Sequence, residues 1–328
     1  MARIYHDEDA DLGILRSKRI AVIGYGNQGR AQGLNLRDNG LEVIVGTSRD
    51  SSWEQAEADG MTVYSAAEAT RQGDVLLLLI PDEILPEVFQ QDIAPGLKKG
   101  DVLDFASGYN IAFKLISPPS FADVVLVAPR MIGLGVRDLF LKGQSFPSFL
   151  GVEQDASGDA LKMALALAKG IGSTKAGAIE MTFAQEAEMD LFSEQALGAI
   201  MSAAFLTAIE VEIEAGYPPE AVLLELYMSG ELGVVFEAMA QKGFLKQMDL
   251  HSQTSQYGTM TRRPRFATPE FKSKMKEVLE EIRSGRFAQE WTAEQKAGHP
   301  LFRELKQKAQ EHPLNEMEER VRRELNKL

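Results

Sequence analysis

The stretch Val22–Gly40, VIGYGNQGRAQGLNLRDNG, follows an apolar run and carries glycines in the spacing G-x-G-x-x-G before an Ala- and Leu-rich helix. Glycines at these places permit a tight turn, close approach of the backbone to a pyrophosphate, and close packing of helix on strand. The amino end of the helix also faces a bound anion. A plain glycine-rich turn shows the same spacing, but the position between strand and helix favours dinucleotide binding. The predicted loop residues are Gly24, Tyr25, Gly26, Gln28 and Gly29.

Apolar, β-rich runs alternate with amphipathic stretches through the first half of the chain. These runs are Arg19–Gly24, Glu42–Gly46, Val75–Pro81, Val102–Ala106 and Val124–Pro129. Continuous apolar runs of this length are typical of parallel strands buried on both faces of a sheet. We therefore expect a doubly wound α/β domain of the Rossmann type. Two further runs, 146–152 and 173–179, are candidate closing strands.

The composition changes near Thr182, where the β-rich runs disappear. Segments such as Ala199–Gly216 are typical of long, mostly buried helices, and small residues within them permit close packing in a bundle or an oligomer. We expect a Rossmann domain over residues 1–181 and an all-α domain over residues 182–328.

Charge and composition exclude several classes of protein. The chain has 328 residues, of which 45% are hydrophobic and 25% charged, as in an ordinary soluble protein of about two domains. A net charge of −13 argues against a nucleic-acid partner, because such binding needs a basic surface. There is no cysteine and no secretory leader pattern, and Val75–Pro81, taken as the longest apolar run, is too short to cross a bilayer. We expect a cytoplasmic protein with no membrane partner.

The segment after the second strand bears on the choice of dinucleotide. An NAD site usually ends this strand with an acid that binds the ribose, whereas here the strand ends at Gly46 and TSRDSSW follows. A guanidinium and hydroxyls suit a 2′-phosphate, and the residues that offer them are Ser48, Arg49, Ser51 and Ser52. Asp50 in the same loop opposes that interpretation, and a polar loop capping the helix from Trp53 is the alternative. NADP is favoured.

A row of acids marks the start of the second half. In TFAQEAEMDLFSEQ, Glu186, Asp190 and Glu194 lie four residues apart, so on a helix they share one face. Carboxylate oxygens suit a hard cation such as Mg²⁺. From spacing alone, a solvated acidic stripe is the commoner arrangement. Glu225, inside an apolar helix with Glu231 six residues on, is a second source of carboxylate.

Together these motifs resemble the ketol-acid reductoisomerase family in its short form, with one helical second domain. The resemblance runs from about Ile14 to the C-terminal tail and rests on VIGYGNQGRAQGLNLRD, LLIPDE, VLVAPR, the segment 154–195 and EAGYPPEAVLLEL. It implies Mg²⁺-dependent alkyl migration in 2-acetolactate or 2-aceto-2-hydroxybutyrate, then reduction by NADPH. This is a step of branched-chain amino acid synthesis.

The resemblance also implies roles for residues. Asp190 would bridge two metal ions, Glu194 would complete one, and Glu225 would come from a second subunit, so that a homodimer is the smallest working unit. Ser252 would contact the substrate. Ser107 and Arg130 occupy catalytic positions, and Pro81, Asp82 and Gly108 belong to the cofactor site.

Four departures from the family pattern affect the chemistry. Ser107 stands where the family usually has His, a proton handler. Arg130 replaces Lys and is effectively never deprotonated, and MIGLG replaces the Gly-Pro-Gly-His run after it. Ser229 replaces a second metal-binding Glu, and on a continuous helix Glu231 would lie about 240° round from Glu225.

The fourth departure lies in the glycine-rich loop, where Asn27 and Arg30 replace Ser and His. Arg30 at the start of the helix is expected to reach a cofactor phosphate. The four changes leave two alternatives to full reductoisomerase activity. One is a reductase of a related 2-keto acid or imine without isomerisation, and the other is a catalytically silent nucleotide-binding oligomer.

Overall fold

The computed structural model describes residues 2–325. The chain forms two compact units, Met1–Met189 and Asp190–Leu328, and the boundary between them falls within helix α8 (Phe183–Phe192). The sequence-based division at 181/182 lies just before that helix and remains a prediction.

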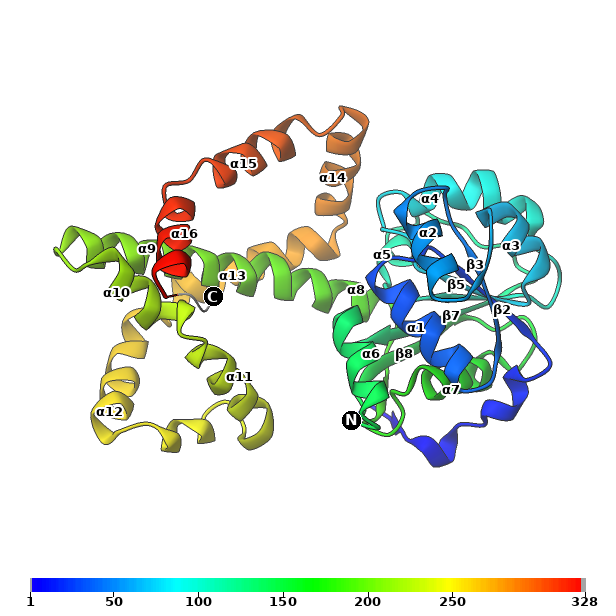
Figure 1. Cartoon of the computed structure of the whole chain (residues 1–328), viewed down its shortest axis with the longest axis horizontal. Coiled ribbons are helices and arrows are strands. Elements are labelled where there is room, and N and C mark those ends of the chain that lie inside the picture. The colour runs from blue at the N-terminus through cyan, green and yellow to red at the C-terminus, as the bar shows by residue number, and fades with distance from the viewer. Residues whose placement is uncertain (1, 326–328) are drawn as a thin grey trace. The chain divides into compact units, whose positions relative to one another are not determined.

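The first unit is a doubly wound α/β domain, as expected, built on one sheet in the order β1-β9-β8-β7-β6-β5-β2-β3-β4 (Figure 1). The six strands from β4 to β7 along this order are parallel, whereas β8 runs antiparallel to β7 and β1 antiparallel to β9. The strands are β1 (Ile4–Tyr5), β2 (Arg19–Ile23), β3 (Glu42–Gly46), β4 (Thr62–Tyr64), β5 (Val75–Leu78), β6 (Val102–Phe105), β7 (Asp123–Pro129), β8 (Ser148–Gln154) and β9 (Ala178–Glu180). The two candidate closing strands are therefore real but shifted toward the C-terminus, and β1 and β4 were not predicted.

Helices cover both faces of this sheet, which explains the continuous apolar strands. In β5, Val75 and Leu77 join one core with side chains of α1, α6 and α7, while Leu76 and Leu78 join the core beneath α3, α4 and α5. The helices of this unit are α1 (Asn27–Asp38), α2 (Ser51–Ala58), α3 (Ala66–Gln72), α4 (Leu85–Val88), α5 (Tyr109–Ala112), α6 (Gly133–Leu141) and α7 (Ala160–Ile171), with short 3-10 helices η1 (Asp7–Asp9), η2 (Leu12–Leu15) and η4 (Ala94–Gly96) and one π-helix, η3 (Phe89–Ile93).

One buried acid lies within the sheet. Asp104 in β6 lies beside Leu77 of β5 on one side and Val125 of β7 on the other, and it is 1% exposed. Neither of its carboxylate oxygens makes a hydrogen bond of ordinary geometry. Burial raises the pKa of Asp104 well above its usual range, and a weak interaction with the backbone of Val127 offsets little of that rise.

The second unit is all helical, as expected. A long helix runs through α8, the π-helix η5 (Ser193–Gly198) and α9 (Ala199–Glu214). The remaining elements are α10 (Pro219–Leu223), η6 (Leu224–Met228), α11 (Glu231–Lys242), η7 (Lys246–Leu250), α12 (Gln253–Arg262), η8 (Arg263–Arg265), α13 (Pro269–Arg283), α14 (Arg286–Lys296), α15 (Pro300–Gln310) and α16 (Leu314–Leu325).

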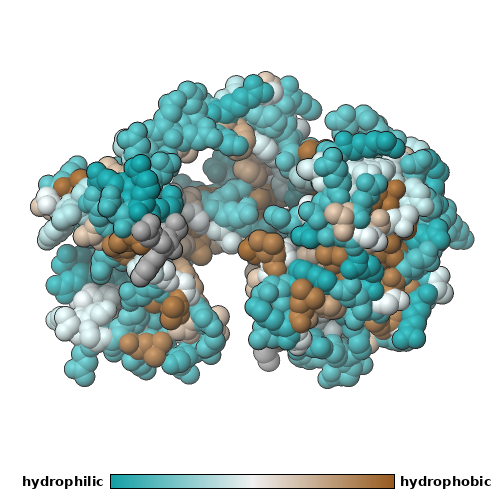
Figure 2. All heavy atoms as spheres, in the orientation of Figure 1, coloured by the Kyte–Doolittle hydropathy of each residue, from teal (hydrophilic) through white to brown (hydrophobic). Residues whose placement is uncertain are grey.

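The helical unit buries little of its apolar surface within one chain. Its core consists of Ile209, Val222, Leu223, Met228 and Val321. Ile209 is the one buried residue that α9 contributes, so the expectation of mostly buried helices is wrong for the single chain. Figure 2 shows apolar side chains at the surface of this unit, and the most exposed large ones include Tyr217 (61%), Val234 (67%), Phe244 (69%) and Phe266 (74%).

The helix Phe183–Glu214 is long and apolar enough, on those two criteria alone, to cross a membrane. This helix, and not Val75–Pro81, is therefore the longest largely apolar segment, although single polar residues interrupt its apolar pattern. Seven acids lie along it: Glu186, Glu188, Asp190, Glu194, Glu210, Glu212 and Glu214. These acids flank residues 195–209, an uncharged stretch shorter than a membrane span needs, so the helix is a weak candidate for a membrane span.

Candidate active site

A cavity of about 690 Å³ opens where β2, β3, β5 and β6 end. It lies between β2 and β5, the neighbouring strands from which the two halves of the sheet extend in opposite directions, β3 and β4 on one side and β6 and β7 on the other. In open α/β sheets this crevice is where ligands bind. The lining comes from the glycine-rich loop, the segment after β3, the start of α3, residues 78–82 and residues 105–107.

The three glycines have the geometry that the motif requires. Gly24 has φ +98°, and a Cβ there would lie 2.7 Å from the carbonyl oxygen of Leu79. A Cβ on Gly29 would lie 2.0 Å from the carbonyl oxygen of Gly24, so the helix packs directly on the turn. At Gly26 no atom lies within 4 Å of a built Cβ, which leaves room for a ligand at the amino end of α1. The loop therefore fits a pyrophosphate.

Residues 131–133, at the start of α6, contact the glycine-rich loop. The Gln28 side-chain amide donates to the carbonyl oxygen of Met131 at 2.9 Å. A Cβ on Gly133 would lie 2.0 Å from the carbonyl oxygen of Asn27. The MIGLG sequence thus packs against the predicted dinucleotide loop, a contact that the sequence pattern did not reveal.

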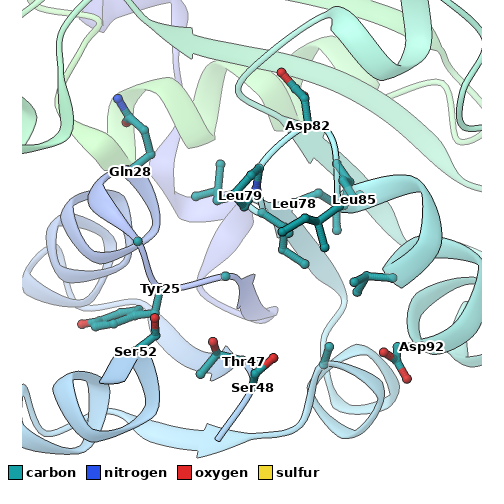
Figure 3. A pocket seen from close by; sticks show the side chains of 18 of the residues that line it. Tyr25, Gln28, Thr47, Ser48, Ser52, Leu78, Leu79, Asp82, Leu85 and Asp92 are labelled. Carbon is teal, nitrogen blue, oxygen red and sulfur yellow. The ribbon is translucent and has the colours of Figure 1, made fainter. Parts of the chain in front are cut away.

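At the β3 end of the cavity, only some of the residues expected to bind a 2′-phosphate are part of the lining. Ser48, Asp50 and Ser52 line the cavity, and Figure 3 shows Ser48 and Ser52 at the end opposite Asp82. Asp50 caps α2, since its Oδ1 accepts the Ser52 backbone N–H at 2.8 Å. Arg49 is not among the lining residues, and its guanidinium lies 5.0 Å from the centre of the Trp53 ring. Ser51 lines a neighbouring cavity instead.

Arg30 is held by an acid that the sequence did not indicate. Its guanidinium donates to both carboxylate oxygens of Asp59, at 2.6 and 2.9 Å, and the Tyr25 hydroxyl donates to Asp59 at 3.1 Å. The hydrogen bond from Arg30 lowers the pKa of Asp59, whereas burial, chiefly, and Asp59 raise the pKa of Tyr25. Because Asp59 is 29 residues from Arg30, no local pattern signals the pair.

At the β5–β6 end of the cavity, Asp82 follows β5 and Ser107 follows β6. Ser107 Oγ donates to Asp82 Oδ2 at 3.0 Å, and the Asn110 side-chain amide donates to Asp82 Oδ1 at 2.9 Å. Ser107 Oγ also accepts the backbone N–H of Tyr109 at 3.3 Å. Parallel neighbouring strands bring these two loops together at one edge, which is the signal from which the proximity of Asp82 and Ser107 could have been predicted.

Glu186 ties the loop after β6 to Arg130. Its side chain is 2% exposed; Oε2 accepts the Gly108 backbone N–H at 2.6 Å and Oε1 accepts Arg130 Nη1 at 3.0 Å. The Arg130 guanidinium also lies 4.8 Å from the centre of the Phe149 ring. A Cβ on Gly108 would lie 2.2 Å from the carbonyl oxygen of Phe183, so the loop and the start of α8 are in close contact.

The acid row is not a uniform solvated stripe. Glu186 is buried, Asp190 is half-buried and Glu194 is exposed. Glu194 lies in the π-helix η5 and Glu225 in a second π-helix, η6. Such i→i+5 segments are rare and often occur at functional sites, and they alter the side-chain directions expected of an α-helix.

The single chain does not assemble a complete metal centre. Within residues 2–325, no three or more His, Cys, Asp or Glu side chains meet as a metal-binding group. Asp190 and Glu194 share one helix, while Glu225 is exposed on another. The donors are all carboxylates, which fit Mg²⁺ chemically, but one chain presents too few of them together.

Two further predicted residues lie in the helical unit. Ser252 is exposed and caps α12, its Oγ accepting the Ser255 backbone N–H at 3.3 Å. Ser229 ends η6, and Gly230 with φ +80° breaks the helix before Glu231 begins α11. Glu231 is therefore on a different helix from Glu225, and the angle expected on a continuous helix does not apply.

Comparison with known proteins covers the whole chain. Residues 14–177 match the acetohydroxy acid isomeroreductase NADPH-binding domain, and residues 183–327 match the ketol-acid reductoisomerase C-terminal domain. The ketol-acid reductoisomerase (NADP(+)) of Pyrobaculum calidifontis is 47% identical over 100% of this chain and 99% of its own length. That of Methanopyrus kandleri is 44% identical over 98% of both.

A solved structure shows the same architecture. An NADH-preferring ketol-acid reductoisomerase from an uncultured archaeon has a TM-score of 0.92 and 40% sequence identity, over 99% of both chains. A semialdehyde dehydrogenase NAD-binding protein from Cupriavidus necator, 17% identical with a TM-score of 0.62 over 81% of this chain and 99% of its own, shares the fold alone. With both family domains matched in order and full-length relatives this similar, the chain belongs to the ketol-acid reductoisomerase family.

Proposed function

We propose that the protein is an NADPH- and Mg²⁺-dependent ketol-acid reductoisomerase that converts 2-acetolactate and 2-aceto-2-hydroxybutyrate to 2,3-dihydroxy-3-methyl acids. One observation carries the proposal: a glycine-lined cavity at the strand ends occurs in the same chain as a row of carboxylates on the next long helix. Relatives over the full length are named for this activity with NADP(+).

The chemistry accounts for both features. Mg²⁺, when bound, would supply polarisation of neighbouring alkoxide and carbonyl oxygens for the alkyl shift, and NADPH, when bound, would supply hydride. Asp190 and Glu194 would hold the metal, with Glu225 from a second copy of the chain. Gly24, Gly26 and Gly29 receive the pyrophosphate, and the Arg130–Glu186 pair fixes the loop at Gly108. Because Ser229 carries no carboxylate, we expect one Mg²⁺ to bind more weakly than the other.

We infer that the exposed apolar helices form a homodimer interface. The helical unit leaves large side chains exposed, and within residues 2–325 Glu225 is not part of any group of three or more His, Cys, Asp or Glu side chains that could hold a metal ion. Exposed apolar surface on this scale marks an association site. The acids along Phe183–Glu214 favour a second chain over lipid, which is consistent with a cytoplasmic enzyme.

A shared site can be tested by subunit complementation. Asp190→Asn and Glu225→Gln homodimers should each be inactive, whereas co-expression should restore about a quarter of wild-type activity. Half of a random mixture is heterodimer, and each heterodimer keeps one intact site when the two residues come from different copies. A site completed within one chain would show no recovery.

A second function is favoured by one observation, the fixed position of the Arg130 guanidinium between Glu186 and the Phe149 ring. A group that never deprotonates cannot relay a proton as Lys does. This alternative is a reductase of 3-hydroxy-3-methyl-2-oxobutyrate without isomerisation. A silent nucleotide-binding oligomer is a third outcome, recognised by NADPH binding without oxidation.

Product analysis separates these functions. The purified protein is incubated with NADPH, Mg²⁺ and either 2-acetolactate or 3-hydroxy-3-methyl-2-oxobutyrate, and products are identified by mass spectrometry. Formation of 2,3-dihydroxy-3-methylbutyrate from both compounds supports the proposal. Formation from the second compound alone supports the reductase, and formation from neither overturns both. Repeating the reaction with NADH measures the cofactor preference.

A further inference from the structure

We propose that the Asp82 carboxylate and the Ser107 hydroxyl form a proton relay, in which Ser107 exchanges protons with the substrate and Asp82 stores them. The inference deepens the proposed function and rests on it. It identifies the groups that handle protons in a chain whose sequence shows no imidazole at this position.

The geometry singles out this pair. Among the residues described as lining the cavity, the titratable side chains are Tyr25, Asp50, Asp82 and Asp92. The Tyr25 hydroxyl, in the glycine-rich loop, donates a hydrogen bond to Asp59. Asp50 caps α2 at the β3 end of the cavity. Asp82 is the carboxylate that accepts a hydrogen bond from a hydroxyl of the same cavity, at 3.0 Å.

The surrounding groups keep the pair aligned. Asn110 donates to Asp82 Oδ1 at 2.9 Å and to the Asp82 carbonyl oxygen at 3.2 Å, which leaves Oδ2 directed to Ser107. Glu186 accepts the neighbouring Gly108 N–H and fixes the backbone beside Ser107. A hydroxyl with one carboxylate acceptor is polarised toward giving up its proton to that carboxylate.

The relay balances the protons of both reaction steps. In the isomerisation, the substrate hydroxyl gives its proton to Ser107 Oγ while the Ser107 proton passes to Asp82. The alkyl group migrates, and the former carbonyl oxygen takes a proton back along the same path, so the pair returns to its starting state. In the reduction, the new carbonyl carbon receives hydride from NADPH and its oxygen takes a proton from Ser107. That proton is replaced by one from solvent through Asp82.

Neighbouring groups are poor substitutes. Guanidinium groups are poor proton donors, and that of Arg130 is paired with Glu186. Glu186 accepts from both Gly108 and Arg130 and is not part of the cavity lining. Each of them holds the loop in place, whereas Asp82 and Ser107 are both part of the cavity lining.

The test compares Asp82→Asn and Ser107→Ala with Glu83→Gln, which removes a charge next to Asp82 but touches neither relay group. Positioned acid–base groups contribute about 10²-fold or more. We expect each relay variant to lose about 10²-fold in kcat for reduction of 3-hydroxy-3-methyl-2-oxobutyrate, and the double variant to lose no more than either single. Glu83→Gln should stay within about twofold.

Two further readouts distinguish a relay from a structural or cofactor-binding role. Isothermal titration calorimetry should give an NADPH Kd within about threefold of wild type for Ser107→Ala, the relay residue that is not assigned to the cofactor site. Because the relay donates a proton in this reduction, wild-type kcat should fall toward alkaline pH, and that fall should be absent in Asp82→Asn. Retained kcat, an unchanged pH profile, or a Kd raised more than about tenfold would overturn the relay while wild type remains active. An inactive wild type would overturn the proposed function and the relay together.

Discussion

Replacing Glu186 tests the link between the cofactor loop and the long helix. Glu186→Gln keeps the side-chain shape and an acceptor for the Gly108 N–H, but it removes the charge that pairs with Arg130. Breaking a buried ion pair costs about 3–5 kcal/mol, and the 31% exposure of the Arg130 side chain reduces this. We expect a loss of about 2–3 kcal/mol. Glu186→Ala should lose about 4 kcal/mol, because the Gly108 N–H is then also left without its partner.

The assay is thermal unfolding combined with a double-mutant cycle. A loss of about 2–3 kcal/mol should lower the Tm by about 5–10 °C. Arg130→Met supplies the second edge of the cycle, and the coupling energy between Glu186 and Arg130 should be about 1–2 kcal/mol. A Glu186→Gln variant within about 0.5 kcal/mol of wild type, or a coupling near zero, would refute this reasoning.

Three other predictions concern the first unit. Because burial raises the pKa of Asp104 above its unfolded value, the folded state holds the extra proton and wild-type stability falls as pH rises between those two values. Asp104→Asn should therefore gain stability relative to wild type as pH rises above about 4, the usual pKa of an unfolded Asp, by up to about 1.4 kcal/mol per pH unit in denaturant titrations; a constant difference would contradict this. Gly133→Ala should weaken NADPH binding at least tenfold in calorimetry, because its Cβ would lie 2.0 Å from Asn27, whereas Gly233→Ala, with open space around it, should not. Arg49→Ala should raise the KM for NADPH by less than about fivefold, since the Arg49 side chain stacks on Trp53 outside the cavity lining; a rise above about 20-fold would mean that Arg49 turns to the 2′-phosphate on binding.

Local patterns predicted the fold well, because its main elements have local causes. The apolar run of β5 is continuous since helices cover both faces of the sheet, and the contact of Gly29 with the Gly24 carbonyl lies within the glycine motif itself. β4 was missed because TVY is short and only half-buried at the sheet edge. The helix break at Ser229–Gly230 has a local signal, because a Ser-Gly pair is typical of turns. The prediction of a continuous helix rested instead on the metal ligand that the family has at position 229.

The site was predicted less completely, because its contacts join residues far apart in sequence. Glu186 meets Arg130 across 56 positions and Gly108 across 78, so no periodicity reveals that this acid is buried and paired. Glu194 and Glu225 lie in π-helices, which change side-chain directions in a way that the assumed α-helical spacing did not indicate. Whether Asp190, Glu194, Glu225 and Ser252 act as the family resemblance implies remains a prediction.

The central claim is that the carboxylate row binds Mg²⁺ for turnover. The most direct measurement is NADPH oxidation with 2-acetolactate over a Mg²⁺ titration, for wild type, Asp190→Asn and Glu188→Gln. Glu188 lies on the same helix but off the row of Glu186, Asp190 and Glu194. We predict Mg²⁺-dependent oxidation by wild type and Glu188→Gln, and loss of at least about 10²-fold in kcat/KM for Asp190→Asn. Equal rates in the presence of a chelator, or full activity of Asp190→Asn, would contradict the account.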